Sequence, residues 1–313
     1  MQSKFEKFDE LPQELQIKTA RSLSTPDLVN LNRTSTNSWN LFQPMVNVSK
    51  LLHQIVRGEH DALQSILKDD ISLIFKRGKV TDCSGRTFEN ISAFEYALWA
   101  LDKHMWAAII ACIPQNEEGR KVFAKLLAQY NKVNTDGVTY RLNGKTITEK
   151  HFDFENTIIK ELQTQVDSIT APNPNWDAID KQWREGVGGA QKLLPMHVVD
   201  EYCSNEPFYP VSKFTSRPKS SRQFYNWITG KSENWFDVGS KLGSDFAIYS
   251  VAAFGRSGLA GGWGRALRSG VVTNDLTALK ALCEARTKDF INLKSQLEEL
   301  ILPRNSGHQV FQI

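Results

Sequence analysis

The segment from residue 9 to residue 44 carries an apolar face that it is too short to bury by itself. Pro12 suits the first turn of a helix, where its missing N–H costs nothing, and Asp9 is a candidate cap before it. Helical spacing places three residues on one face of this first helix, Leu15, Thr19 and Leu23.

The sequence "STPD" then interrupts the helix. Thr25 is a candidate cap for a second helix with Pro26 at its first position, and this helix carries Leu28 and Leu31. So few residues cannot enclose a core around their leucines. The segment must therefore dock either on the rest of the chain or on a partner.

Composition narrows the class of protein. A chain of 313 residues with 41% hydrophobic and 23% charged residues is an ordinary globular mixture of about two domains. The net charge of only +3 argues against nucleic acid as a partner. The sequence shows neither an apolar leader typical of a cleaved signal peptide nor an apolar run long enough to span a bilayer, which favours a cytoplasmic protein.

The cysteines and histidines predict no metal site, disulfide framework or cofactor. The four cysteines are widely spaced without a C-x-x-C pair, and the six histidines are scattered without an H-E-x-x-H motif. Reduced thiols are the simplest interpretation. The cysteines are Cys83, Cys112, Cys203 and Cys283.

Residues 49–150 predict helical repeats with one hairpin. "KLLHQIVRGEHDALQSIL" has helical spacing with a break at Gly58, and "SAFEYALWALDKHMWAAIIACI" has the same pattern with a break at Asp102 and Lys103. A turn-rich, extended segment separates them, so the unit is used twice. "TYRLNGKTIT" predicts a hairpin with a type I′ turn at its Asn-Gly pair.

Residues 151–313 predict a helical C-terminal region. "FENTIIKELQTQVDSI" and "WDAIDKQWREGV" are amphipathic, and residues 275–300 predict a long helix capped by Asp275 and ended by Pro303. By its length, the apolar run "FAIYSVAAF" (residues 246–254) is predicted to be a buried helix. The Pro- and Ser-rich segment 205–221 is long for a loop.

Three aromatic residues in that segment have two interpretations. If Phe208, Tyr209 and Phe214 are exposed, they form a surface that binds a target protein. If they are buried, they fix the segment to the helices beneath it, which is the interpretation that the sequence favours.

Residues 8–42 resemble an F-box, the motif that binds the adaptor Skp1 in SCF-type cullin–RING ubiquitin ligases. The matching residues are Leu11, Pro12, Glu14, Leu15, Ile17, Leu23, Asp27, Leu28, Leu31, Ser35 and Trp39. The resemblance implies that eight of these contact Skp1, namely Leu11, Pro12, Leu15, Ile17, Leu23, Leu28, Leu31 and Trp39. An internal helical cap on the neighbouring repeats is the alternative.

Residues 55–113 resemble degenerate ankyrin repeats. "RGEHDALQSIL" is similar to the second-helix signature, and "DCSGRT" followed by "SAFEYA" is similar to the loop and first-helix signature. The resemblance implies a concave protein-binding face, whereas a plain helical bundle would bury much the same core. An F-box followed by such repeats resembles the eukaryote-like effectors that intracellular bacteria secrete through a type IV system, and Glu298, Glu299 and Phe311 suit a C-terminal secretion signal of that class.

Motifs for catalysis are weak. Gly230, Lys231 and Ser232 lack the preceding glycine of a phosphate-binding loop, because position 225 is Tyr. The glycine-rich stretch 254–270 follows no predicted strand and fits a tight turn between helices better than an anion-binding loop. His197, Asp200 and Cys203 are spaced three residues apart and could in principle form a nucleophilic site. Such a site needs side chains that converge, whereas side chains at this spacing on one helix point apart. Catalysis is therefore the minor interpretation of these residues.

The sequence thus predicts a mostly α fold with three parts: an F-box at residues 1–48, ankyrin-like repeats with a hairpin at 49–150, and a helical region at 151–313. The predicted function is that of a non-enzymatic substrate receptor that binds Skp1 and recruits an unidentified target to the ligase. The resemblance to effectors implies action in a host cell cytosol without a cleaved signal peptide. The alternatives are a scaffold with no link to a ligase and a cysteine-dependent enzyme in the C-terminal half.

Overall fold

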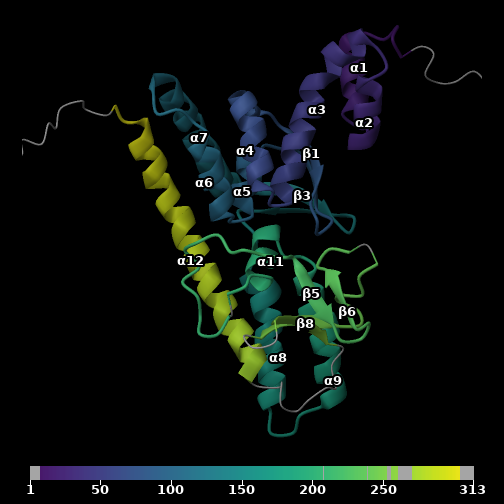
Figure 1. The fold of residues 1–313 in the computed structure, drawn as a ribbon, viewed down its shortest axis with the longest axis vertical. Helices are drawn as coiled ribbons and strands as arrows, with labels where there is room; N and C mark the ends of the chain where they lie inside the picture. The colour runs from purple at the N-terminus through teal and green to yellow at the C-terminus, as the bar shows by residue number, and fades with distance from the viewer. Residues whose placement is uncertain (1–7, 207, 238, 252–254, 260–269, 304–313) are drawn as a thin grey trace, which may run out of the picture.

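Helices dominate the fold, in agreement with the predicted mostly α class. The computed structural model describes residues 8–206, 208–237, 239–251, 255–259 and 270–303. Helix accounts for 58% of the structure and strand for 13%, so the sheets are minor elements. The molecule is elongated, with the N-terminal helices at one end and the second sheet in the opposite half (Figure 1).

Three helices open the chain, α1 (Gln13–Ala20), α2 (Thr25–Asn32) and α3 (Thr36–Val56). The cap of α2 is Ser24, whose side chain accepts the N–H of Asp27, so the expected cap at Thr25 was wrong by one residue. The α1 N-cap position is Pro12 itself, without a side-chain cap from Asp9. The expected boundary between residues 48 and 49 lies inside α3, which continues unbroken past it.

Five helical elements follow α3, and four helices, including α3, form two packed pairs. The five elements are α4 (His60–Asp69), the 3₁₀ helix η1 (Ile71–Phe75), α5 (Ala93–Trp99), α6 (Lys103–Ala111) and α7 (Glu117–Asp136). Helix α3 packs on α4 and α5 packs on α6, while α3 also contacts α5 and α4 contacts α6. Each pair turns at a residue with left-handed backbone, Gly58 (φ 67°) in the first and Leu101 (φ 56°) in the second. The predicted break at Gly58 is confirmed. The second break was predicted at Asp102 and Lys103, and it includes Asp102, which caps α6, whereas Lys103 is the first residue of that helix.

A four-stranded antiparallel sheet lies against these helices. Its order is β1-β2-β3-β4, with β1 (Gly78–Thr81), β2 (Thr87–Ile91), β3 (Val138–Leu142) and β4 (Lys145–Glu149). The predicted hairpin is confirmed, because Asn143 (φ 50°) and Gly144 (φ 76°) have the positive φ values that a type I′ turn requires. Phe88 of β2 and Tyr140 of β3 pack the sheet against α5, because their ring centroids lie 5.0 and 5.5 Å from that of Trp99.

The second half begins with helices and ends in a sheet. The helices are the π-helix η2 (Glu155–Ile159), α8 (Lys160–Thr170), α9 (Trp176–Lys181), the π-helix η3 (Gln182–Val187), α10 (Gly188–Gln191) and α11 (Met196–Tyr202). The strands are β5 (Gln223–Asn226), β6 (Lys231–Asn234), β7 (Ala247–Val251) and β8 (Gly255–Leu259), in the order β6-β5-β8-β7. The expectation of a single hairpin was therefore wrong, since the described part of the chain holds eight strands in two sheets.

Strand β7 replaces the helix expected for residues 246–254, of which 252–254 lie outside the described residues. An apolar run of this length suits a buried helix or a buried strand equally well. The buried side-chain amide of Gln191 stabilises the strand, because it accepts the N–H of Ile248 at 2.8 Å and donates to the carbonyl of Ile248 at 2.5 Å. Strand β8 likewise occupies residues 255–259 of the glycine-rich stretch, in place of a turn between helices; positions 260–269 are not described.

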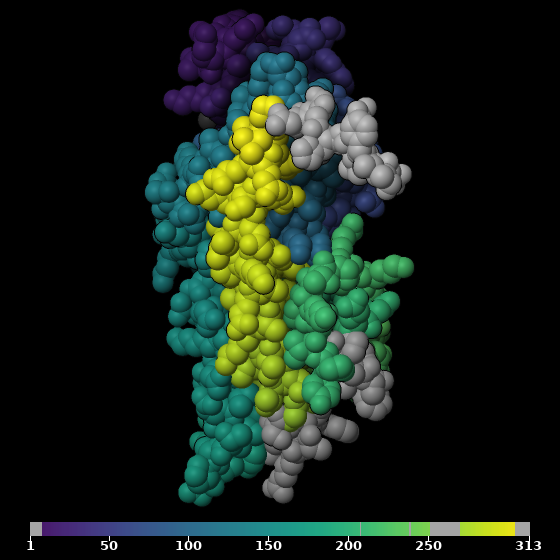
Figure 2. Space-filling view, turned by 90° about the vertical axis from the view of Figure 1, so that its left-hand side faces the viewer, coloured from purple at the N-terminus to yellow at the C-terminus, as the bar shows by residue number. Residues whose placement is uncertain are grey.

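The last helix, α12 (Gly270–Ile301), connects the two halves of the molecule. It packs against α7 in the first half and α8 in the second, and Figure 2 shows it running along one face between these helices and the segment that follows α11. The predicted long helix is confirmed, but Asp275 does not cap it. This residue is fully buried one turn inside the helix, where its carboxylate accepts the N–H of Ser250 on β7.

One continuous hydrophobic cluster extends from α3 to α12, so the core is not interrupted at the expected boundary between residues 150 and 151. A second, smaller cluster belongs to the N-terminal helices alone. Its buried members are Phe8, Ala20, Leu28, Phe42 and Val46.

Two glycines test the packing of the helices. A Cβ on Gly119, in the first turn of α7, would lie 1.6 Å from the carbonyl oxygen of Pro114, whereas a Cβ on Gly189 meets no atom within 4 Å. We expect Gly119→Ala to lower the free energy of unfolding by at least about 2 kcal/mol. Gly189→Ala should leave it unchanged or raise it by up to about 1 kcal/mol, because alanine favours helix. Denaturant unfolding of both variants checks this, and equal stability would contradict it.

Candidate protein-binding surface

The N-terminal helices form a module at one end of the molecule, which we define as residues 8–46 (Figure 1). Helices α1 and α2 pack on the first half of α3 around the second hydrophobic cluster. Polar side chains fix this arrangement: Asn32 on α2 donates to Gln43 on α3 at 2.8 Å, and the buried Gln16 donates to the carbonyl of Leu11 at 2.8 Å. The module thus has a core and a defined surface of its own.

That surface carries large apolar side chains. Leu11 and Leu15 are 38% and 46% exposed and Trp39 is 50% exposed, and Pro12 lies between the two leucines on the exposed side. Leu15 lies in the first turn of α1, and Leu11 lies just before the helix, on the other side of its N-cap residue Pro12. Large apolar groups that remain in water although a core lies beside them are typical of a surface that meets another protein.

The other predicted contact residues lie deeper. Ile17, Leu23 and Leu31 are half-buried, and Leu28 is 4% exposed within the small core. Leu28 therefore stabilises the module rather than offering a contact. Four of the eight predicted residues are exposed in the structure, and they come from α1, the residues before it and the first turn of α3.

The segment after α11 exposes fewer aromatic side chains for target binding than the sequence allowed. Phe208 and Phe214 are buried and contact each other edge to face, and Phe208 also packs on Tyr202 of α11, so they fix the segment to the helices. Of the three aromatic residues proposed to bind a target, only Tyr209 is exposed. The interpretation that these rings fasten the segment therefore holds for Phe208 and Phe214.

The residues of the predicted nucleophilic set have separate partners. The Nε2–H of His197 donates to the carbonyl of Ala100 at 2.7 Å, and Asp200 accepts the Nε–H of Arg222 at 2.8 Å. Cys203 is fully buried among apolar residues. Among the residues that the structure describes, no three His, Cys, Asp or Glu side chains are grouped so that they could hold a metal ion, and no helix is long and apolar enough to cross a membrane.

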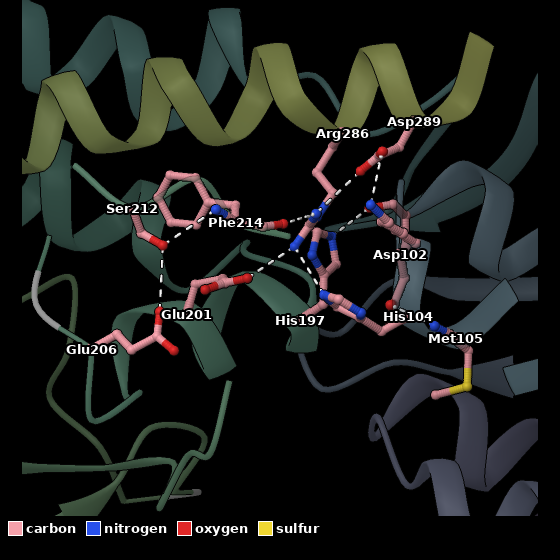
Figure 3. Close-up of polar contacts among 12 residues, drawn as sticks. Asp102, His104, Met105, His197, Glu201, Glu206, Ser212, Phe214, Arg286 and Asp289 are labelled. Carbon is pink, nitrogen blue, oxygen red and sulfur yellow. Dashed lines mark hydrogen bonds and ion pairs between the residues drawn. The ribbon is translucent and has the colours of Figure 1, made fainter. Parts of the chain in front are cut away.

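A buried polar cluster, shown in Figure 3, joins the two halves beneath α12. At its centre is Arg286 on α12, whose side chain is fully buried. Its guanidinium donates to Glu201 Oε1 of α11 at 2.9 Å and to the Phe214 carbonyl at 2.8 Å, and lies 3.2 Å from His104 Nε2 of α6. Asp289 accepts from both Arg286 and Lys103. The sequence analysis did not identify this cluster, because its members lie far apart along the chain.

Burial sets the protonation states in the cluster. It lowers the pKa of His104 and that of His197 to about 4, because each imidazolium would lose its water, and the positive charge of Arg286 acts in the same direction. Burial raises the pKa of Glu201 to about 7, an effect that Arg286 opposes. Both histidines are therefore neutral at neutral pH, and Nε2 of His104 accepts a hydrogen bond from Arg286.

Comparison with known proteins gives the chain a family. A family model described as the CBUA0006 C-terminal domain matches residues 157–297, from η2 into α12. The protein printed as "Uncharacterized protein CBUA0006" of Coxiella burnetii (strain RSA 493 / Nine Mile phase I) is 36% identical over 262 residues, which are 78% of this chain and 73% of that protein. The chain belongs to the CBUA0006 family. No solved structure matches it.

Replacement of Arg286 tests the buried cluster. Arg286→Met keeps much of the apolar volume but leaves Glu201 buried without its cation. We expect a loss of about 3–5 kcal/mol in the free energy of unfolding. The exposed ion pair of Lys121 with Glu118 provides the control, since Lys121→Ala should leave the free energy of unfolding nearly unchanged. A small effect of Arg286→Met would contradict a joining role for the cluster.

The lowered pKa of His197 predicts loss of stability in acid. Between its usual value of 6.5 and about 4 the unfolded chain binds a proton that the folded chain does not, so the free energy of unfolding falls as pH falls through this window. The contribution reaches up to about 3 kcal/mol. His197→Gln keeps an N–H donor for the Ala100 carbonyl but cannot titrate. We expect the variant to lose less stability than the wild type between pH 7 and pH 4.5 in urea unfolding; equal losses would refute the assignment.

Proposed function

We propose that the chain is an F-box substrate receptor, in which the N-terminal module binds Skp1 and the remainder recruits a target protein to an SCF-type cullin–RING ubiquitin ligase. The observation that carries the proposal is the combination of a separate small core with an exposed apolar surface at Leu11, Pro12, Leu15 and Trp39. An internal helical cap would turn these side chains inward against the repeats. Here they lie on the outside of the module.

The continuous helix α3 supports a receptor role. It belongs to the module at its N-terminal end and packs against α4, α5 and β1 at its other end. A helix of this length reaches about 30 Å, so it sets the distance of the module from the body, and Pro44 inside it lies near the end of the module. A receptor without catalytic residues depends on such geometry, because its effect comes from the position of the target relative to the ligase.

The paired helices support the ankyrin-like part of the proposal. The pairs α3–α4 and α5–α6 pack on each other through α3 with α5 and α4 with α6, and in both pairs the turn between helices contains a residue with left-handed backbone. Two equivalent units that bury their faces against each other are what a helical repeat requires. The four-stranded sheet distinguishes this region from a plain repeat array.

The proposal includes a place of action. The chain would act in the cytosol of a host cell as an effector secreted by a bacterium without a cleaved signal peptide. The relative at 36% identity comes from Coxiella burnetii, which is in keeping with a bacterial source. Of the residues suggested for the secretion signal, Glu298 and Glu299 lie in α12 and Phe311 lies outside the described residues.

A scaffold with no link to a ligase is the second candidate. The turn between β5 and β6 exposes Trp227 and Ile228 beside Tyr225, whose ring lies 5.0 Å from that of Trp227. This apolar tip is separate from the N-terminal module and would allow protein binding without Skp1.

Binding to purified Skp1 tests the proposal. We expect the wild type to bind, and Leu11→Ala/Leu15→Ala to bind at least about tenfold more weakly, because it removes two exposed apolar contacts. Ile291→Ala is the matched control: Ile291 is 62% exposed on α12, far from the module in sequence, and its loss should leave binding unchanged.

Circular dichroism and thermal unfolding establish that all three proteins are folded. Failure of the wild type to bind Skp1 would refute the receptor and favour the scaffold. Equal binding by wild type and double variant would place the Skp1 contact elsewhere.

A further inference from the structure

A groove of about 710 Å³ opens in the first sheet, at some distance along the chain from the N-terminal module. One wall is β2, from Thr87 to Ile91, and the other is β3, from Val138 to Arg141. The C-terminal turn of α7 and residues Arg77 and Glu95 close its remaining sides. The volume lies within the range of sites that bind small molecules and peptides.

The groove exists because β2 and β3 separate. The recorded register between them is the single pair Thr87 and Arg141, whereas β3 and β4 pair at five successive positions. Continued antiparallel pairing would place Glu89 opposite Thr139. Instead both residues line the groove, one on each wall.

The backbone of β3 directs polar groups into the groove. Residues that flank a two-residue turn form a hydrogen-bonded pair, here Leu142 and Lys145, and alternation along the strand then turns the N–H and C=O of Thr139 away from β4. Thr87 pairs with Arg141, and a register shift between Phe88 and Ile91 interrupts the alternation on β2 beyond it. Thr139 thus offers a free strand edge to a ligand in the groove.

The charges at the groove are unequal. Arg77 forms an ion pair with Glu95 and donates to the carbonyl of Asn90, and Glu89 forms an ion pair with Lys79. Among the described residues no ion pair is recorded for the remaining charged side chains, which are Lys132, Asp136 and Arg141. Two cations against one anion favour an acidic ligand.

We propose that this groove binds an extended peptide segment of a partner protein, whose backbone pairs with the open edge at Thr139 and whose acidic side chain lies near Arg141 and Lys132. Addition of a strand is the mode of recognition that an open sheet edge provides: the main chain gives affinity and the side chains give specificity. The site would be where a substrate receptor holds its target, but peptide binding does not itself depend on Skp1.

The test begins with the purified full chain and a displayed library of short random peptides. We expect the wild type to enrich peptides with an acidic position, and one of these is then synthesised with a fluorescent label for titration. Thr139→Pro removes the N–H that faces the groove and should weaken binding at least tenfold.

Thr148→Pro is the matched control. Thr148 lies opposite Thr139 and its hydroxyl is 2.7 Å from that of Thr139, so either change removes that contact. The N–H of Thr148 faces away from β3 at the outer edge of the sheet, and the variant should bind like the wild type. Arg141→Glu should reverse the selection towards basic peptides.

Hydrogen exchange of the wild-type chain gives a measurement that needs no variant. The bound peptide should slow exchange of the Thr139 amide at least tenfold. Three outcomes would each overturn the proposal: no enrichment by the wild type, equal weakening by Thr139→Pro and Thr148→Pro, or binding without protection of this amide. None of these experiments contains Skp1, so a negative result would not bear on the proposed link to the ligase. Equally, absence of Skp1 binding would not bear on peptide binding by the groove.

Discussion

The buried guanidinium of Arg286 holds the two halves of the molecule together. It reaches from α12 to Glu201 on α11, to the carbonyl of Phe214 and to His104 on α6. A charge without solvent is costly unless its hydrogen bonds are made, so these partners must occupy their places for α12 to pack. The long C-terminal helix thereby acquires one register against both halves. A purely apolar interface would fix that register less strictly, since apolar contacts are non-directional.

The surfaces proposed to bind partners lie outside this joined core. The module at residues 8–46 depends on its own small cluster, and the groove in the first sheet opens where β2 leaves β3. Neither surface shares a polar contact with Arg286 among the described residues. A rigid centre with separate binding surfaces is the arrangement that a receptor needs, because it can engage two proteins at once without rearranging its core.

Local sequence predicted much of the helical framework and part of the candidate surface. The helix breaks at Gly58 and Asp102, the type I′ turn at Asn143 and Gly144, and the long last helix all follow from signals a few residues long. Leu11, Leu15 and Trp39 were identified from the resemblance to an F-box, and all three are exposed. Leu28 could not be distinguished from them, since an apolar residue of a short helix has the same pattern whether it faces a partner or a neighbouring helix.

The sequence by itself determined which stretches are helical and where the first helix pairs turn, because glycines and helical periodicity act within one or two turns of the backbone. Only the tertiary structure decided that residues 247–251 form a strand, since Gln191 and Asp275 supply the hydrogen bonds that hold it. It also decided that Phe208 and Phe214 face inward, and that β2 and β3 part to leave a groove. Each of these outcomes depends on contacts between residues tens of positions apart, whose energies no local pattern records.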